Sequence, residues 1–201
     1  MRKLIQKISA VLFFAVVFSS NAFALIIIDV NDNNGHAEFS FSGSDVVSTS
    51  GQLNNGFWLN DLAEVMAYSG DPNFFGQHSI VSGAADFVLD NEAYGIQDVW
   101  VNGDRYDHEL GFRSHSNPFN VSAGSIVGLT GSIVTDLNYS WFNEGIYSFI
   151  SVGPYSNEEA LLTEGIQFNV GSVNPVPEPS IIALLGFGLA GFGFSRRNKK
   201  V

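Results

Sequence analysis

Acidic and amide side chains are concentrated in the segment 29–35, whose sequence is DVNDNNG. Calcium prefers six to eight oxygen ligands from such side chains and from backbone carbonyls on a tight turn. Asp29, Asn31 and Asn33 are therefore candidate Ca²⁺ ligands. The spacing departs from the EF-hand pattern, because the glycine is one position late and Ser40 stands where the bidentate Glu belongs. A polar hairpin turn is the alternative, since Asn-Gly favours a type I′ turn.

A second polar group is the segment DRYDHE at 104–109, with His115 close behind it. His108 with Asp104 or Glu109 has the ligand chemistry for a metal ion. No H-E-x-x-H spacing supports this metal site. The alternative is an exposed loop in which Arg105 and Arg113 pair with surplus acids.

Aromatic residues provide a third possibility. Trp58, Trp100 and Trp141 have the flat apolar surface with a polar edge on which sugar rings stack. Core packing is the alternative for each of them.

Hydrolytic chemistry has no specific signal in the sequence. The G-x-S-x-G motif of serine hydrolases is absent. A carboxylate pair for glycoside hydrolysis is uninformative among 20 acidic residues. We therefore expect no enzymatic activity and no cofactor, with Ca²⁺ as the one ion considered.

Composition excludes several classes of protein. The chain has no cysteine, which removes disulfides, thiolate metal sites and thiol nucleophiles. Its net charge of −11 argues against nucleic-acid binding, which requires a basic face. Arg105 and Arg113 are the only basic residues between positions 8 and 195. The central region is therefore strongly acidic, and the positive charge gathers at the two ends.

The elements that must position these residues are short strands separated by Gly, Asn, Asp and Ser. Alternating or apolar runs predict strands at 25–30, 37–42, 85–89, 96–101, 125–134, 146–152 and 166–170. Within 96–101, Asp98 and Trp100 should share one face of the strand, and Val99 and Val101 the other. A short helix is expected over 61–67, capped by Asn60. The pattern predicts an all-β fold, a single jelly-roll-like β-sandwich over residues 25–173.

The first 24 residues have the pattern of a secretory signal peptide. Basic residues at 2, 3 and 7 precede an apolar run at 8–18, and Ala22-Phe23-Ala24 forms a cleavage site. Removal of this helical segment would leave Leu25 as the first residue. An uncleaved anchor is the alternative, although the apolar run is short for a membrane span.

The C-terminal region 174–201 has three parts in a fixed order. Val176-Pro177-Glu178-Pro179 should be extended, because proline restricts its own φ and the residue before it. The segment 180–195 carries no charge and is predicted to be a transmembrane helix. Arg196, Arg197, Lys199 and Lys200 follow, and this basic cluster should remain in the cytoplasm.

This order resembles the PEP-CTERM protein-sorting signal, which combines a Pro-Glu-Pro motif, a short Gly-rich transmembrane segment and a basic tail. The resemblance implies that an exosortase-like membrane enzyme recognises the motif at 176–179. It also implies an exported protein of a Gram-negative bacterium that makes exopolysaccharide and biofilm matrix. Tails of this family are also described as ice-binding. This chain has only four scattered threonines, which form no regular ice-binding array.

Together these features predict an exported structural protein of the cell surface or exopolysaccharide matrix. Signal peptidase would process one end and the sorting enzyme the other, with an inner-membrane precursor between the two steps. A carbohydrate-binding module is the alternative function, and a secreted hydrolase is a further one.

Overall fold

The computed structural model describes residues 25–53, 55–68, 70–103, 108–114, 119–153 and 159–171. The chain divides into two compact units, Met1–Gly171 and Ser172–Val201, and every described residue belongs to the first. The predicted signal peptide and sorting tail lie outside the described residues. Within the described ranges, no helix has the length and apolar character needed to cross a membrane.

The described chain is built almost entirely of β-strands, which with isolated bridges account for 72% of it. This confirms the all-β prediction. The strands are β1 (Ile26–Asn33), β2 (His36–Ser42), β3 (Ser44–Thr49), β4 (Gly51–Leu53), β5 (Gly56–Leu59), β6 (Gly76–Leu89), β7 (Glu92–Gly95), β8 (Asp98–Gly103), β9 (His108–Arg113), β10 (Phe119–Val121), β11 (Ile126–Asn138), β12 (Gly145–Val152) and β13 (Ala160–Val170).

Eleven strands join into one sheet in the order β12-β13-β1-β2-β11-β6-β8-β9-β5, with β3 and β7 attached beside this path. Strands β4 and β10 form a separate pair. The first and last strands, β1 and β13, lie next to each other in parallel, with Ile26 opposite Ile166. Other neighbours in the path are antiparallel.

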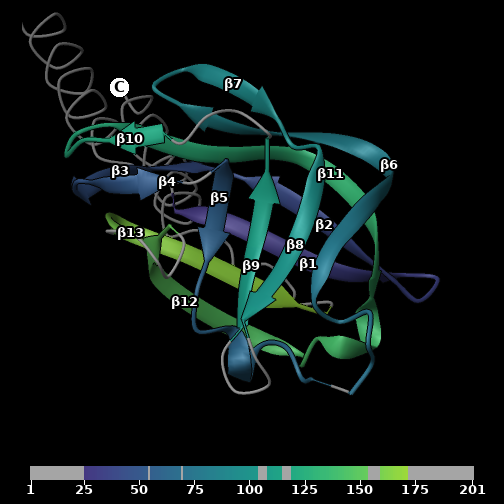
Figure 1. The fold of residues 1–201 in the computed structure, drawn as a ribbon. Coiled ribbons are helices and arrows are strands. Elements are labelled where there is room, and N and C mark those ends of the chain that lie inside the picture. Colours follow the sequence, from purple (N-terminus) through teal and green to yellow (C-terminus); the bar gives the residue numbers. More distant parts are fainter. Residues whose placement is uncertain are drawn as a thin grey trace, which may run out of the picture. The chain divides into compact units, whose positions relative to one another are not determined.

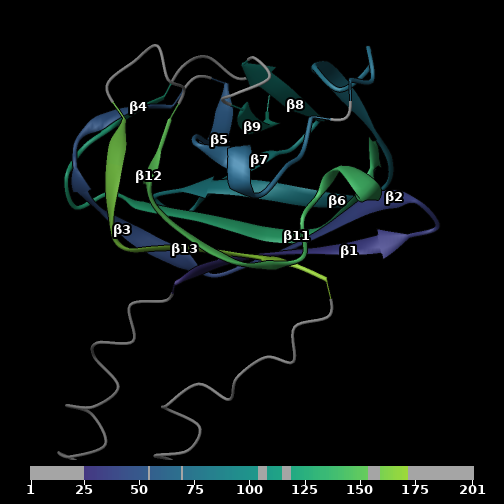
Figure 2. The same cartoon turned by 90° about the horizontal axis from the view of Figure 1, so that it is seen from below.

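The long strand β6 carries the sheet from one side of the molecule to the other. Its first residues, Gly76–Ser79, pair with β8, and the residues from Ile80 onward pair with β11. Strands β8, β9 and β5 consequently lie in front of β1, β2 and β13 (Figure 1), and the view from below separates the two portions (Figure 2). The sheet is continuous through β6, so the predicted division into a jelly-roll-like sandwich of two sheets is not confirmed.

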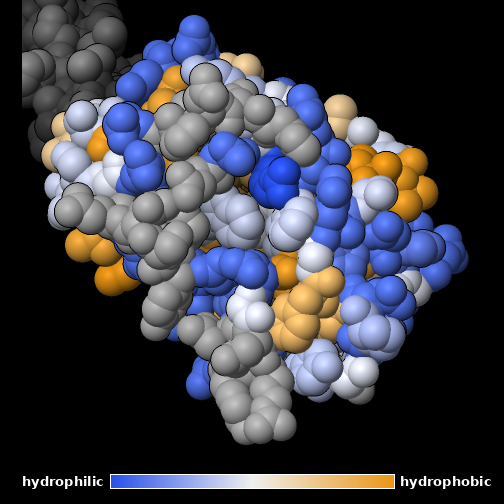
Figure 3. Space-filling view, viewed as in Figure 1, coloured by the Kyte–Doolittle hydropathy of each residue, from blue (hydrophilic) through white to orange (hydrophobic). Residues whose placement is uncertain are grey.

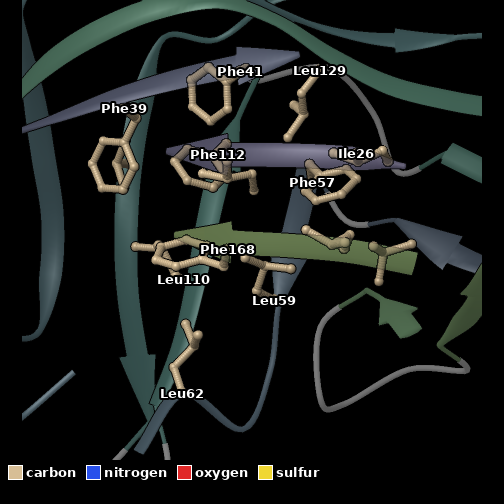
Figure 4. Packing of buried hydrophobic residues seen from close by; sticks show 14 of the residues in the cluster. Ile26, Phe39, Phe41, Phe57, Leu59, Leu62, Leu110, Phe112, Leu129 and Phe168 are labelled. Atoms are coloured by element: carbon tan, nitrogen blue, oxygen red, sulfur yellow. The ribbon is translucent and has the colours of Figure 1, made fainter. Parts of the chain in front are cut away.

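The core lies between these two portions of the sheet. Phe112 of β9 meets Phe39 and Phe41 of β2, with ring centroids 5.2 Å and 4.9 Å apart and the rings edge to face. Ile26 of β1 and Phe168 of β13 are fully buried in the same cluster (Figure 4). Aromatic pairs of this geometry add about 0.5–1.5 kcal/mol beyond the burial of their area.

Two local expectations have opposite outcomes. The Asn-Gly turn is confirmed, because Asn34 and Gly35 both have positive φ between β1 and β2. The helix expected over 61–67 is wrong in length, since only Leu62–Glu64 forms a single 3₁₀ turn. Its cap is also wrong: Asp61 is the N-cap, with φ of 58°, and the Asn60 side chain donates instead to Gly153 O and Glu159 Oε1.

The residues on either side of β12 are tied to β5 and to the segment that follows it. Gly153 N donates to Trp58 O at one end of β12, and Asn143 N donates to Val65 O at the other. Met66 and Phe142 form an isolated bridge beside the second contact.

Glycine is required in the middle of β11. Gly131 has φ of 98°, and a Cβ atom there would overlap Ala84 O of β6. A side chain at this position would therefore push β11 and β6 apart. Gly124 has a similar φ of 94°, but nothing lies within 4 Å of the position of its Cβ.

Replacing these two glycines by alanine separates backbone strain from steric overlap. Gly124→Ala should cost about 1–2 kcal/mol of unfolding free energy, the penalty for a side chain at positive φ. Gly131→Ala should cost about 1–3 kcal/mol more, because the strands must also move apart. Urea unfolding followed by circular dichroism measures both losses. Equal losses would show that the approach of β6 to Gly131 does not matter.

Candidate functional site

The outward side of β5, β9 and β8 carries two tryptophans in one row. The strand register places Trp58, Gly111 and Trp100 side by side, and Gln77 of β6 continues the row. The residues that alternate with them, such as Phe57, Val99 and Phe112, point into the core. We call the outward side the tryptophan face; Figure 3 shows it from the front, with hydrophilic and pale intermediate residues over β8 and β9.

Gly111 allows the Trp58 indole to lie against the backbone of β9. A Cβ atom at Gly111 would come within 2.6 Å of Trp58 ring atoms, so only glycine fits beneath the ring. The arrangement leaves Trp58 8% exposed although it points away from the core.

Next to this row lies an ion pair that is largely excluded from water. Arg113 Nε is 3.3 Å from Asp98 Oδ1, and the Asp98 side chain is 3% exposed. Gln77 Nε2 donates to Asp98 Oδ2 at 2.8 Å. The Arg113 guanidinium also stands 4.7 Å from the centre of the Trp100 ring, which is a cation–π contact. Arg113 is the only lysine or arginine among the described residues, and it holds a buried carboxylate and an indole together.

On the other side of the tryptophan row the strands carry amide and carboxylate groups. Asn102 of β8 lies opposite Glu109 of β9, and its Nδ2 donates to Glu109 Oε2 at 2.9 Å. Asn60 follows β5 directly and is 5% exposed. The tryptophan row is thus bordered on both sides by planar polar side chains.

Several buried polar atoms of this face have no hydrogen-bond partner among the described residues. They include the donor Nε1 of Trp100, the acceptor Oδ1 of Asn60, and Nε of Arg113, which makes only its ion-pair contact. A buried polar group without a partner costs about 1–3 kcal/mol, so such groups are rare and require an explanation.

The three predicted stacking tryptophans lie in different surroundings. Trp141 is 5% exposed and packs against Phe74 and His78 inside the molecule. Trp58 is buried against Gly111, whereas Trp100 retains part of its surface. The structure therefore provides no set of three exposed coplanar rings and brings only Trp58 and Trp100 together.

The candidate calcium ligands lie on a strand rather than in a loop. Asp29, Asn31 and Asn33 occupy alternate positions of β1, so their side chains share its outward face. Asp29 Oδ1 accepts from Asn169 at 2.7 Å, and Asn33 Nδ2 donates to Glu38 Oε2 at 3.0 Å. The described residues contain no group of three His, Cys, Asp or Glu side chains able to hold a metal ion. Calcium binding here stays a prediction.

The histidine cluster is divided by strand geometry. His108 and Glu109 are consecutive in β9 and point to opposite faces, so they do not share a metal ion. His108 packs on the rings of Phe74 and Phe75 in the interior. Residues 104–107 and His115 lie outside the described residues. No local pattern indicates the pairing of His78 with Asp136, whose atoms Nδ1 and Oδ1 are 3.1 Å apart across 58 positions.

Two tyrosines have altered acidity. A hydrogen bond from its hydroxyl to Glu92 raises the pKa of Tyr94, with smaller contributions from burial and the Glu92 charge. Burial raises the pKa of Tyr139, and the charges of Glu144 and Asp32 add to the effect. Neither residue belongs to the tryptophan face.

Comparison with known families finds a match, and it lies in the C-terminal region. Residues 175–197 match the family model described as the PEP-CTERM protein-sorting motif. The chain carries a PEP-CTERM sorting signal. No curated protein and no solved structure shows significant similarity to the chain.

The PEP-CTERM signal supports sorting to the cell surface by an exosortase, through an exported and membrane-anchored precursor. The predicted sorting residues Val176, Pro177, Glu178 and Pro179 fall inside the matched segment, as do Arg196 and Arg197. Lys199 and Lys200 follow it, and all of these residues lie outside the described structure. Ala22 and Ala24 of the predicted cleavage site also lie outside it.

Variants of Arg113 and Asp98 test how much their ion pair contributes to the free energy of unfolding. Arg113→Gln should lower the unfolding free energy by about 2–3 kcal/mol, because it leaves the buried Asp98 charge without its cation. Combining it with Asp98→Asn should recover at least about 1 kcal/mol, since no buried charge then remains. Urea unfolding of the two single variants and the double variant measures the coupling. If the losses of the two single variants add up to the loss of the double variant, the two residues are not coupled.

Proposed function

We propose that the protein is an exported, non-enzymatic structural protein of the cell surface or exopolysaccharide matrix, delivered there by its PEP-CTERM signal. The matched motif at 175–197 carries this proposal. The signal peptide at 1–24 would start export, and the helix at 180–195 would hold the precursor in the inner membrane. The basic residues at 196–200 would keep the tail end in the cytoplasm, with the β-domain outside.

The boundaries of the folded domain are compatible with processing at both ends. β1 begins at Ile26, so cleavage after Ala24 would remove no residue of the sheet. β13 ends at Val170, and Gly171 N donates to Val30 O as the last described contact. The sorting motif begins several residues later, so a cut there would also leave the sheet whole. Folding and sorting therefore use separate parts of the sequence.

The charge distribution favours a soluble domain in the extracellular matrix over a domain bound to the membrane surface. Among the described residues Arg113 is the one basic side chain, against 16 acidic ones. Such a surface remains soluble and is repelled by anionic lipid headgroups. The released domain would therefore not be held at the membrane by charge, and would remain in the matrix.

Intact mass and cell fractionation test the proposal in a host with and without its exosortase. With the enzyme present, the protein should lack both the first 24 residues and the tail, and should leave the membrane fraction. Without the enzyme it should retain the tail and remain in the membrane. A tail that stays attached in both hosts would contradict sorting and leave a simple membrane-anchored domain.

Variants of the motif give a matched comparison. Glu178→Ala should abolish tail removal, because it destroys the Pro-Glu-Pro triplet while leaving the membrane segment intact. Pro175→Ala changes a neighbouring proline outside the triplet and should be processed normally. The intact mass of each variant from the enzyme-containing host shows whether its tail has been removed. Equal processing of both variants would show that the triplet is not what the enzyme reads.

A further inference from the structure

We propose that two copies of the chain associate edge to edge through β12, with the two β12 strands antiparallel around a two-fold axis at Ser148. The partner on this edge is thus a second copy of the same chain. The association does not depend on how the protein is sorted.

The edge of β12 that faces away from β13 is open along its middle. Among the described residues β12 pairs along its length with β13 only, and it ends the path of the sheet. No residue of the segment 145–151 is buried. Tyr147 and Phe149 pack against the core but are only partly buried. Their neighbours on β13, Phe168 and Ile166, are buried. The contrast indicates that the described residues leave this side of β12 uncovered.

Two contacts set the length of the open edge. Asn143 N donates to Val65 O before β12 begins, and Gly153 N donates to Trp58 O after it ends. Between these contacts the segment after β5 forms its 3₁₀ turn and does not pair with β12. A strand added to this edge is therefore limited to the middle of β12, the segment 146–150.

The sequence of β12 gives this edge no charge and no proline. Natural proteins place such residues on edge strands, because unpaired backbone N–H and C=O groups otherwise bind another strand. The strand reads GIYSFISV, and its irregularity between Phe149 and Ser151 lies at the end of the open segment. Ile146 and Ile150 point outward and are 56% and 64% exposed. The strand therefore offers backbone groups and apolar surface to one extended partner.

Two features identify that partner as a second copy. The outward row Ile146, Ser148, Ile150 reads the same in both directions, so antiparallel pairing about Ser148 places each isoleucine opposite an isoleucine of the copy. In this register Glu144 lies opposite Val152 of the copy, so no two carboxylates face each other along the paired segment. Two acidic molecules can therefore meet here without direct repulsion, whereas a basic partner finds no carboxylate on the strand. Because both copies use the same edge, the assembly closes as a dimer.

A single cysteine tests the placement of the axis, because the native chain has none. Ser148→Cys places two thiols opposite each other, with Cα atoms about 4.5–5.5 Å apart, which is within the range of a disulfide. Ser132→Cys is the control: Ser132 is exposed on β11, which lies between β2 and β6 and has no free edge there. The full chain is purified in detergent, oxidised and separated by non-reducing gel electrophoresis.

We expect the Ser148→Cys chain to form a covalent dimer and the Ser132→Cys chain to remain largely monomeric. Equal cross-linking of both variants, or none of the Ser148→Cys chain, would overturn the proposal. Oxidation of intact cells before lysis reveals other occupants of the edge. A covalent adduct of the Ser148→Cys chain with a different protein, in place of the dimer, would also overturn it.

An added charge tests whether the two copies separate. Ser148→Asp sets two carboxylates against each other at the axis and should raise the dissociation constant of the dimer at least about tenfold. Ser132→Asp adds the same charge in the middle of the sheet and should leave the dissociation constant unchanged. Sedimentation of the full chain in density-matched detergent measures both constants, and thermal unfolding confirms that each variant is folded. A native chain that is monomeric at about 100 μM, or equal dissociation constants for the two variants, would contradict the proposal.

Discussion

The contact of Phe112 with Phe39 and Phe41 is the interaction on which the rest of the structure depends. These rings belong to β9 and β2, which are not neighbours in the sheet, and they meet because β6 carries the sheet across from β11 to β8. Without them the apolar inward side of each portion of the sheet would be uncovered. The fold is therefore held by side chains across the core rather than by the strand ladder, which a flatter sheet would form equally well.

The same bend creates the outward face of β8, β9 and β5. Once Val99, Leu110 and Phe112 point inward, strict alternation fixes Asp98, Trp100, Glu109, Gly111 and Arg113 on the outside. A surface of that composition would be expected to be exposed, yet Asp98 is 2% and Glu109 6% exposed. The protein places its one described basic side chain there, where it offsets the cost of a buried carboxylate. Polar groups have thus been sequestered on an outer face, which is unusual in a chain that has acidic surface in excess.

Local periodicity predicted much of this from the sequence, and long-range pairing accounts for what it missed. Alternation placed Asp98 and Trp100 on one face and Val99 and Val101 on the other, and Asn-Gly marked the β1–β2 turn. Strands β3, β4, β5, β7, β9 and β10 were not expected, because they are short, and β5 pairs with β9 more than 50 positions along the chain. The stacking of Trp58 on Gly111 and the pairing of His78 with Asp136 have no local signature. The sorting signal, in contrast, is read in order along the chain, so the sequence alone was sufficient to find it.

The parallel pairing of β1 with β13 makes the sheet depend on the last strand of the domain. The first strand of the domain lies between β2 and the last strand, so the centre of the sheet cannot be completed until Val170 is available. Contacts between such distant residues form late and slowly, because the intervening loop must be closed first. The sorting signal follows β13 directly in sequence, so the chain reaches its membrane-anchoring segment only after the last strand required for folding has been made.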